Sequence, residues 1–184
     1  MTTRRALLGA TAVLASVAVV PRTIGAAVTS TPKPPPNLVV ISDRVVTSGQ
    51  PSAEWLRTLK AQGFDAVVYL APPTVQDAVP EEAVIVAGQG LAFVNIPIDF
   101  ERPAERDYEL FAAVMRGLAS RKVLVHCQIN LRASSMVFLY RVIALSGDPE
   151  RAYDSVSRVW KPDGPWLRFI EAQLQRNGVA FKPY

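Results

Sequence analysis

Cysteine and histidine are almost absent from this chain, because its 184 residues include one of each. A single cysteine excludes an internal disulfide. A single histidine makes a conventional metal cluster hard to assemble. We therefore predict that the protein requires no metal and no cofactor. The two scarce residues are neighbours in the sequence, His126 and Cys127, so one short segment holds both.

The chain also lacks a marked excess of charge outside its first 27 residues. Residues 1–27 hold Arg4, Arg5 and Arg22 and no acidic residue, and an apolar run occupies residues 6–20. Paired arginines before such a run resemble a twin-arginine export signal. A run of about 15 apolar residues is short for a membrane span, which needs about 20. We predict export to the periplasm, with a membrane anchor formed by an uncleaved signal as the alternative.

Without that segment, 17 basic side chains face 16 acidic ones. This balance gives no indication of a nucleic-acid partner, and we expect no membrane association after processing. Residues 28–37 contain a proline-rich stretch that we predict to be an extended, exposed linker. Residues 38–184 have the length and apolar content of one domain with one good core.

This remaining sequence alternates apolar strands with amphipathic helices, as α/β proteins do. Predicted strands cover residues 38–41, 45–46, 66–70, 92–96 and 123–125, and predicted helices cover 52–63, 81–88, 104–118 and 132–145. The apolar side chains expected on the inner side of the third helix are Leu110, Phe111, Val114 and Leu118. Trp160 and Trp166 are interpreted as packing residues at the joint of two C-terminal helices. Because the strands are apolar without alternation, we predict a mostly parallel central sheet flanked by helices.

The segment after strand 123–125 has the parts of an anion site with a nucleophile. Arg132 lies five residues beyond Cys127 and opens a helical stretch. A thiol at a helix N-terminus beside cationic groups can have its pKa lowered from about 8.5 to about 3.5–7.5. Arg132 offers a planar fork for two phosphoryl oxygens. Each residue alone fits a packing role, but their order after a strand and before a helix favours a phosphate-binding loop.

The segment from His126 to Ser134 resembles the signature loop of cysteine-dependent protein phosphatases of the dual-specificity type, within the protein tyrosine phosphatase superfamily. More narrowly, it resembles a bacterial branch that includes the phosphatase domain of beta-lactamase-hydrolase-like proteins. A turn at residues 47–52, Thr-Ser-Gly-Gln-Pro-Ser, is similar to one near the start of that branch. The resemblance covers about residues 38–177 and implies a dual-specificity-phosphatase-like fold.

The resemblance also implies an activity and roles for the loop residues. The activity is hydrolysis of phosphomonoesters, either phosphotyrosine, phosphoserine and phosphothreonine in proteins or small phosphate esters, through a phosphocysteine intermediate. Cys127 attacks, and His126 orients and tunes the surroundings of the sulfur. The phosphoryl group is held by the residues from the one after the cysteine onward: Gln128, Ile129, Asn130, Leu131, Arg132, Ala133 and Ser134.

Phosphatases of this type take a general acid from the loop after the preceding strand. Asp99 lies in that loop, 28 residues before Cys127, and is the first candidate for protonating the leaving group. Glu101 is the second candidate and Asp107 the third. An acid just before a helix can instead complement the helix dipole.

The loop departs from the family pattern at two positions. Ala133 stands where a hydroxyl usually helps the sulfur to leave, so either Ser134 takes that role or the phosphocysteine breaks down slowly. Asn130 replaces the usual glycine, and asparagine tolerates a left-handed backbone better than most residues. The departure at Ala133 keeps a non-catalytic phospholigand-binding protein open as an alternative. Sulfurtransferases also hold a cysteine in an anion-binding loop, often with a span to arginine one residue shorter, and on loop length we expect a phosphatase instead.

Overall fold

The structure is a computed structural model that describes residue 2 and residues 32–184, and the latter form one compact unit. The predicted export signal, apart from residue 2, lies outside the described residues. The strands are β1 (Val39–Val40), β2 (Val45–Ser48), β3 (Ala66–Tyr69), β4 (Ala92–Asn95) and β5 (Val123–His126). The helices are α1 (Ala53–Leu56), α2 (Glu82–Ala87), α3 (Glu105–Gly117), α4 (Leu131–Leu139), the π-helix η1 (Tyr140–Ala144), α5 (Pro149–Ser157) and α6 (Gly164–Arg176).

The five strands form one sheet in the order β1-β2-β5-β3-β4. Only β1 pairs antiparallel, and the other neighbours are parallel. All four residues of β3 and of β5 are buried, since these strands occupy inner positions. Apolar runs without alternation are typical of strands covered on both faces. The predicted mostly parallel sheet flanked by helices is therefore confirmed.

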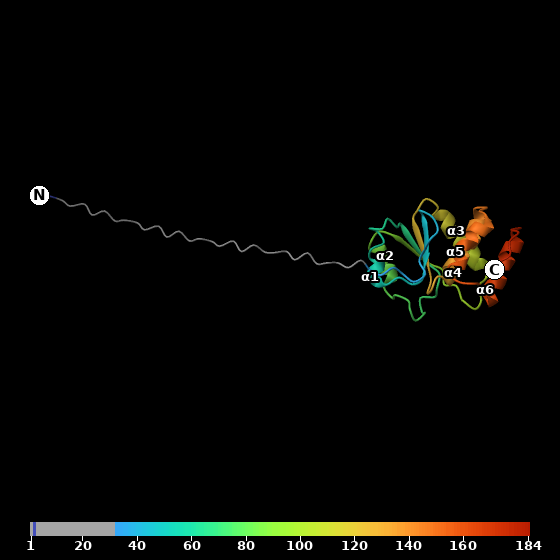
Figure 1. The fold of residues 1–184 in the computed structure, drawn as a ribbon. Helices are drawn as coiled ribbons and strands as arrows, with labels where there is room; N and C mark the ends of the chain where they lie inside the picture. The colour runs from blue at the N-terminus through green and yellow to red at the C-terminus, as the bar shows by residue number, and fades with distance from the viewer. Residues whose placement is uncertain (1, 3–31) are drawn as a thin grey trace. The chain divides into compact units, whose positions relative to one another are not determined.

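Two layers of helices cover the sheet. α1 and α2 lie on one face, and α3 to α6 lie on the other (Figure 1). Successive side chains of a strand point to opposite faces, so Leu124 of β5 packs with Trp55 and Leu59 in the smaller core. Val123 and Val125 pack into the larger core, which also holds Phe138 of α4. β5 therefore has a core on each side, and the loop that follows it starts from a firmly held strand.

Local signals set where several helices begin and end. The Ser52 hydroxyl accepts from the N–H of Trp55 and caps α1, as its sequence position indicates. α1 is shorter than predicted because the chain continues from Leu56 in turns to Gly63, whose φ of 79° suits glycine. In α3, the prediction that Leu110 faces inward is wrong: it is 52% exposed. Tyr108 and its helical neighbours on the same side supply the buried face instead.

The proline-rich stretch does not run free of the domain. Pro35 is buried, and the carbonyl of Pro36 accepts from the N–H of Gly49 at 2.7 Å. Asn37 contacts the loop after β5 through its side chain and its carbonyl. Pro36 and Asn37 are exposed as predicted, but this end of the stretch is not a free linker, because the turn after β2 and the loop after β5 bind it. None of the described helices is long and apolar enough to cross a bilayer.

Candidate active site

A cavity of about 360 Å³ lies where β5 ends and α4 begins. Parallel sheets bind ligands at the carboxyl ends of their strands, so this is the expected edge. The cavity is lined by residues from three loops: Asp77, Phe100, Cys127, Gln128, Ile129, Leu131 and Arg132. The structure therefore brings together the predicted nucleophile, the predicted arginine and three of the other predicted phosphate-binding residues. The side chains of Asn130, Ala133 and Ser134 stand outside this lining.

Cys127 lies at the base of this cavity and is 1% exposed. Its own N–H is bound to the carbonyl of Ser48 at 3.3 Å, which continues the pairing of β5 with β2. The residues after it turn into α4, whose first free N–H groups and positive dipole end lie beside the loop. This environment favours an anion at the position that the sulfur faces.

Arg132 is held in place by its surroundings although its charge faces the cavity. It is 5% exposed, and its Nε donates to the carbonyl of Ile98 at 3.0 Å. The guanidinium carbon lies 5.0 Å from the centre of the Phe100 ring, a cation–π contact. Its Nη1 is 3.5 Å from Oε1 of Gln128, a weak contact that a bound oxyanion can replace. The remaining N–H groups can bind phosphoryl oxygens.

Asn130 gives the loop its shape. It has φ 75° and ψ 5°, the left-handed conformation predicted for this position. Its side chain points away from the cavity, and Nδ2 donates to the carbonyl of Asn37 at 2.6 Å and to Oγ1 of Thr47 at 3.0 Å. Asparagine thus adopts the left-handed backbone conformation that glycine would adopt here. It also makes two hydrogen bonds that glycine cannot make.

The turn at residues 47–52 supports the cysteine loop from the side. The N–H of Gln50 donates to the carbonyl of Gln128 at 2.8 Å. Gly49 is so close to the loop that a Cβ there would lie 2.8 Å from that carbonyl oxygen and 3.1 Å from Cα of Ile129. Glycine is needed at this point because two backbones touch. The two parts of the sequence that carry the family resemblance are therefore in direct contact.

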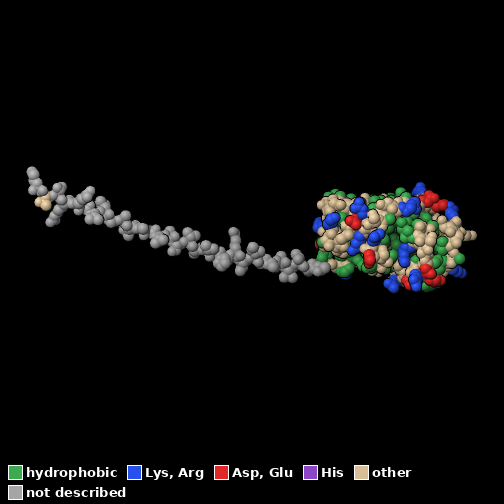
Figure 2. Space-filling view, turned by 90° about the horizontal axis from the view of Figure 1, so that it is seen from above, with side chains coloured by type: hydrophobic (Ala, Val, Ile, Leu, Met, Phe, Trp, Pro, Cys, Tyr) green, Lys and Arg blue, Asp and Glu red, His purple; other side chains and the backbone are tan. Residues whose placement is uncertain are grey.

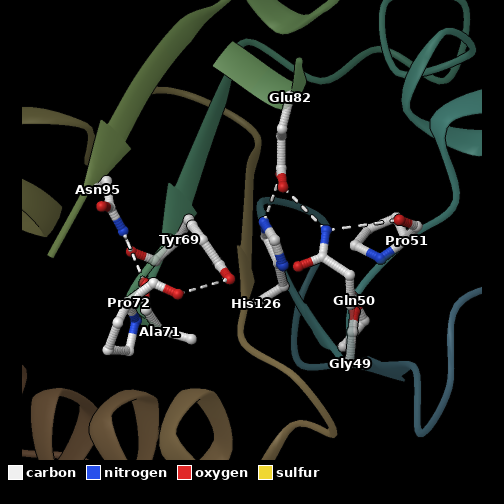
Figure 3. Close-up of polar contacts among 10 residues, drawn as sticks. Gly49, Gln50, Pro51, Tyr69, Ala71, Pro72, Glu82, Asn95 and His126 are labelled. Atoms are coloured by element: carbon white, nitrogen blue, oxygen red, sulfur yellow. Dashed lines mark hydrogen bonds and ion pairs between the residues drawn. The ribbon is translucent and has the colours of Figure 1, made fainter. Parts of the chain in front are cut away.

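His126 is buried and contacts a second acid that we did not single out in the sequence. Its Nε2 lies 2.6 Å from Oε1 of Glu82, and Oε2 of Glu82 accepts from Nε2 of Gln50 at 2.8 Å (Figure 3). Tyr69 stacks on the imidazole ring, with ring centroids 4.7 Å apart and an angle of 14°. Glu82 is 3% exposed. The local sequence of Glu82 is that of an ordinary acid at the start of a helix. Only the tertiary structure therefore reveals its contact with His126.

The three predicted proton donors lie outside the cavity lining. Asp99 accepts from Nε of Arg102 at 2.9 Å and from the N–H of Glu101 at 3.0 Å. The hydrogen bond from Arg102, followed by that from the Glu101 backbone, lowers the pKa of Asp99, so the protonated form that a proton donor needs is less populated. Glu101 is exposed, and Asp107 accepts from the N–H of Ala104 at the start of α3. The geometry does not support the prediction for any of the three.

Asp77 is the acid that does line the cavity. It belongs to the loop after β3, which our sequence reasoning did not consider. The signal was available, since β3 was a predicted strand and its carboxyl end lies at the same edge as that of β5. Asp77 is exposed at the mouth, where a carboxyl group can exchange protons with water.

The helix after the loop leaves no hydroxyl at the position of Ala133, which is fully buried. The hydroxyl of Ser134 donates to the carbonyl of Leu131 at 3.2 Å, back along its own helix. Ser134 is therefore not placed as a substitute for the missing hydroxyl. Of the two explanations for Ala133, slow release of the phosphoryl group fits this geometry better.

The spacing of the loop requires one correction. Four residues, 128–131, separate Cys127 from Arg132, whereas the expectation of a phosphatase on loop length took five intervening residues. The expectation that loop length argues against a sulfurtransferase is therefore wrong. The choice between these classes depends on the rest of the chain.

Trp166 confirms the packing interpretation, since it is 1% exposed, and it also reaches the site. Its Nε1 donates to the carbonyl of Phe100 at 2.9 Å. Trp160 is partly buried and packs edge-on to Trp166. The joint between α5 and α6 thus holds the residue whose ring covers Arg132.

Charges outside the site show no concentration of one sign on the face in Figure 2, where Lys and Arg side chains alternate with Asp and Glu. A nucleic-acid-binding surface needs clustered Lys and Arg. That face has no such cluster.

Most of the described chain matches a known protein family. Residues 35–165 match the profile of the family described as "DSP-PTPase phosphatase fused to NAD+ Kinase". The chain is 26% identical over 158 residues to the beta-lactamase hydrolase-like protein of Xylella fastidiosa. That match covers 79% of this chain and 35% of the relative, so the chain spans about a third of that protein's length.

Solved structures agree with this placement. A DUF442 protein of Shewanella putrefaciens CN-32, described as a candidate phosphatase, is 28% identical with a TM-score of 0.70, over 78% of this chain and 92% of its own. The TpbA protein of P. aeruginosa in complex with pTyr is 16% identical with a TM-score of 0.59, over 78% of this chain and 85% of its own. The 28% identity to the Shewanella protein supports a common origin of the two sequences. The 16% identity to TpbA supports only that the two folds are alike.

Proposed function

The chain belongs to the family of DSP-PTPase phosphatases described as fused to NAD+ kinase, and from this we propose that it hydrolyses phosphomonoesters through a phosphocysteine intermediate. The observation that carries the proposal is that Cys127 and Arg132 line one cavity at the N-terminus of α4. A nucleophile and a bidentate oxyanion donor at one anion site are what phosphoryl transfer needs. The family placement supports a phosphatase of the dual-specificity type.

In the first step, the Cys127 thiolate attacks phosphorus as the bond from phosphorus to the leaving oxygen breaks. Arg132 and the loop N–H groups bind the three equatorial oxygens, over which charge spreads in the transition state. The leaving oxygen takes a proton from an acid at the cavity mouth. We assign this role to Asp77, since it lines the cavity.

In the second step, water attacks phosphorus and the bond from sulfur to phosphorus breaks. The carboxylate formed in the first step takes a proton from that water, so inorganic phosphate leaves and the thiolate and the acid return to their starting states. Ala133 offers no hydroxyl to the departing sulfur, so this step is expected to be the slower one.

The substrate is expected to be a phosphorylated protein or a small phosphate ester. The cavity wall is largely apolar, with Phe100, Ile129 and Leu131, and holds one arginine and one acid. Such a lining suits one phosphoryl group on an apolar or aromatic carrier.

Localisation is a separate proposal that depends on residues 1–27. Paired Arg4 and Arg5 ahead of the apolar run support export to the periplasm. Fractionation of cells that produce the wild type and a variant with both arginines changed to lysine tests this. If the wild type and the variant were found in the same cell fraction, a twin-arginine signal would be contradicted.

The experiment for the phosphatase proposal is capture of the intermediate. With an aryl phosphate as substrate, acid quenching should leave one phosphoryl group on Cys127, detected by peptide mass spectrometry. Cys127→Ser should lower turnover to less than about a hundredth of wild type, and Arg132→Lys should impair both binding and rate because the fork is lost. Turnover by Cys127→Ser above that level would remove Cys127 from the mechanism.

A second candidate is sulfur transfer, which the four-residue spacing after Cys127 favours. In that reaction Cys127 takes a sulfane sulfur from a donor such as thiosulfate and passes it to a nucleophile such as cyanide. The two are separated by assaying the same preparation with thiosulfate plus cyanide and with an aryl phosphate. Phosphate binding that protects Cys127, without turnover of either substrate, would instead identify a phospholigand-binding protein.

A further inference from the structure

A buried acid lies beside the histidine that precedes the nucleophile. Glu82 is the first residue of α2, is 3% exposed, and places Oε1 2.6 Å from Nε2 of the fully buried His126 (Figure 3). Its other oxygen accepts from Gln50 at 2.8 Å. Glu82 and Gln50 stand outside the lining of the cavity, so the reaction steps above leave both without a task.

The short separation requires a proton between acid and ring. A carboxylate oxygen and an unprotonated ring nitrogen at 2.6 Å would repel each other through their lone pairs, and a buried carboxylate without a counter-charge is costly. The two atoms are not aligned as an ordinary N–H···O hydrogen bond. The contact of Glu82 with His126 is attractive when the acid and the ring hold a proton between them, and it is strongest for a carboxylate beside an imidazolium.

The groups that face the imidazole come from three elements. α2 supplies Glu82, β3 stacks Tyr69 on the ring, and β2 places Ser48 opposite His126 in the strand register. Tyr69 stays neutral, because burial, aided by the charges of Glu82 and Cys127, raises its pKa to about 12. Within residues 32–184, Glu82 forms no ion pair with a lysine or arginine. His126 is thus the basic side chain that lies against this carboxyl group.

The same tyrosine links the pair to the sulfur. The charges of Glu82 and of Cys127 both raise the pKa of the Tyr69 phenol, and His126, which Glu82 contacts, is the residue next to Cys127. A carboxylate alone would disfavour a nearby thiolate, whereas an imidazolium on the residue next to Cys127 favours it. Protonation of His126 decides which of the two effects prevails.

We propose that Glu82 is a positioning residue for the nucleophile: it keeps His126 protonated and fixed so that Cys127 is a thiolate at neutral pH, and Gln50 orients the carboxylate. The proposal rests on the proposed function only in that Cys127 is the reacting group. It gives the turn at residues 47–52 a second contribution to the site, besides the support of the loop by Gly49 and Gln50.

The test measures the reactivity of Cys127 without any substrate turnover. The rate of alkylation by iodoacetamide, followed from pH 4 to pH 10, reports the thiolate fraction. In Glu82→Gln the midpoint of this profile should move upward by about one pH unit or more, since the imidazolium loses its partner. Glu81→Gln removes the same charge one residue away from an exposed side chain, and its profile should match wild type.

A second measurement shows whether Glu82 acts through the histidine. Glu82→Gln should lower the rate of the burst with an aryl phosphate at pH 6 by at least about tenfold, because the burst reports attack by the thiolate. It should change the dissociation constant of inorganic phosphate by less than about threefold, because the groups that bind the phosphoryl oxygens are untouched. In a His126→Asn background, the same change should add less than about twofold. An equal loss in both backgrounds would show that the acid supports only the fold.

Each outcome decides one proposal. A folded Glu82→Gln protein with an unshifted alkylation midpoint overturns the role of Glu82 even if the chain is a phosphatase. A shifted midpoint in a chain that hydrolyses no phosphomonoester upholds that role and rejects the proposed function. If Glu82→Gln does not fold, as circular dichroism would show, Gln50→Leu replaces it: an upward shift supports the proposal and an unchanged midpoint overturns it.

Discussion

The indole of Trp166 donates a hydrogen bond to the backbone carbonyl of Phe100, with 2.9 Å between Nε1 and the oxygen. The Phe100 ring in turn lies over the guanidinium of Arg132. A tryptophan in the last helix therefore sets the position of one wall of the cavity, although it does not touch the cavity itself.

Trp166→Phe should weaken the site more than it weakens the fold. The loss of one buried hydrogen bond costs about 1 kcal/mol, and a looser Phe100 should raise KM for an aryl phosphate several-fold. Trp160→Phe is the matched control, since Nε1 of Trp160 has no partner among the described residues. Steady-state kinetics and denaturant unfolding measure both effects. Equal changes in KM for the two variants would contradict this prediction.

Asp77→Asn should lower kcat/KM for alkyl phosphates far more than for aryl phosphates, by about 10²-fold or more, because kcat/KM reports the first step, in which an alkoxide needs protonation to leave. Asp99→Asn should do little. Its carboxylate is bound by Arg102 and the Glu101 backbone, contacts that lower its pKa, and it stands outside the cavity lining. A selective defect in Asp99→Asn, with Asp77→Asn near wild type, would reverse the assignment.

Ala133→Ser should accelerate the second chemical step. Wild type should release a burst of alcohol roughly equal to the enzyme and then turn over slowly, because no hydroxyl assists the departing sulfur. A serine at position 133 should raise the steady rate several-fold and leave the burst unchanged. Ser134→Ala should change little, since that hydroxyl is bound to Leu131. Rapid-mixing kinetics that show no burst in wild type would exclude slow breakdown of the intermediate.

Asn130→Ala should destabilise the protein more than Asn130→Gly. Alanine costs about 1–2 kcal/mol in the left-handed backbone, and both variants lose the hydrogen bonds to Asn37 and Thr47. We expect a decrease in the free energy of unfolding of about 1–2 kcal/mol for glycine and about 2–4 kcal/mol for alanine. Urea unfolding measures both. If both variants lowered the free energy of unfolding by the same amount, a Cβ at this position would cause no backbone strain and the prediction would be wrong.

The sequence by itself determined the sheet, the loop and the main parts of the site. Apolar strands without alternation predicted inner parallel strands, and β3 and β5 have that place because such strands must be covered on both faces. The neighbouring His126 and Cys127, with Arg132 opening a helix, predicted an anion site, since all three lie in one continuous segment. Local chemistry also indicated the left-handed backbone of Asn130.

Only the tertiary structure decided which acids reach the site. Asp99, Asp77 and Glu82 are all acids in or next to loops and helix starts, and their sequence surroundings do not rank them. Packing turns Asp99 toward Arg102, opens Asp77 to the cavity and buries Glu82 against His126. The Asp99 pair is local, but Glu82 and His126 are 44 positions apart, and Asp77 lines the cavity with Cys127, which is 50 positions further along the chain. Contacts between distant residues depend on how helices and loops pack on the sheet, which local propensity and spacing do not specify.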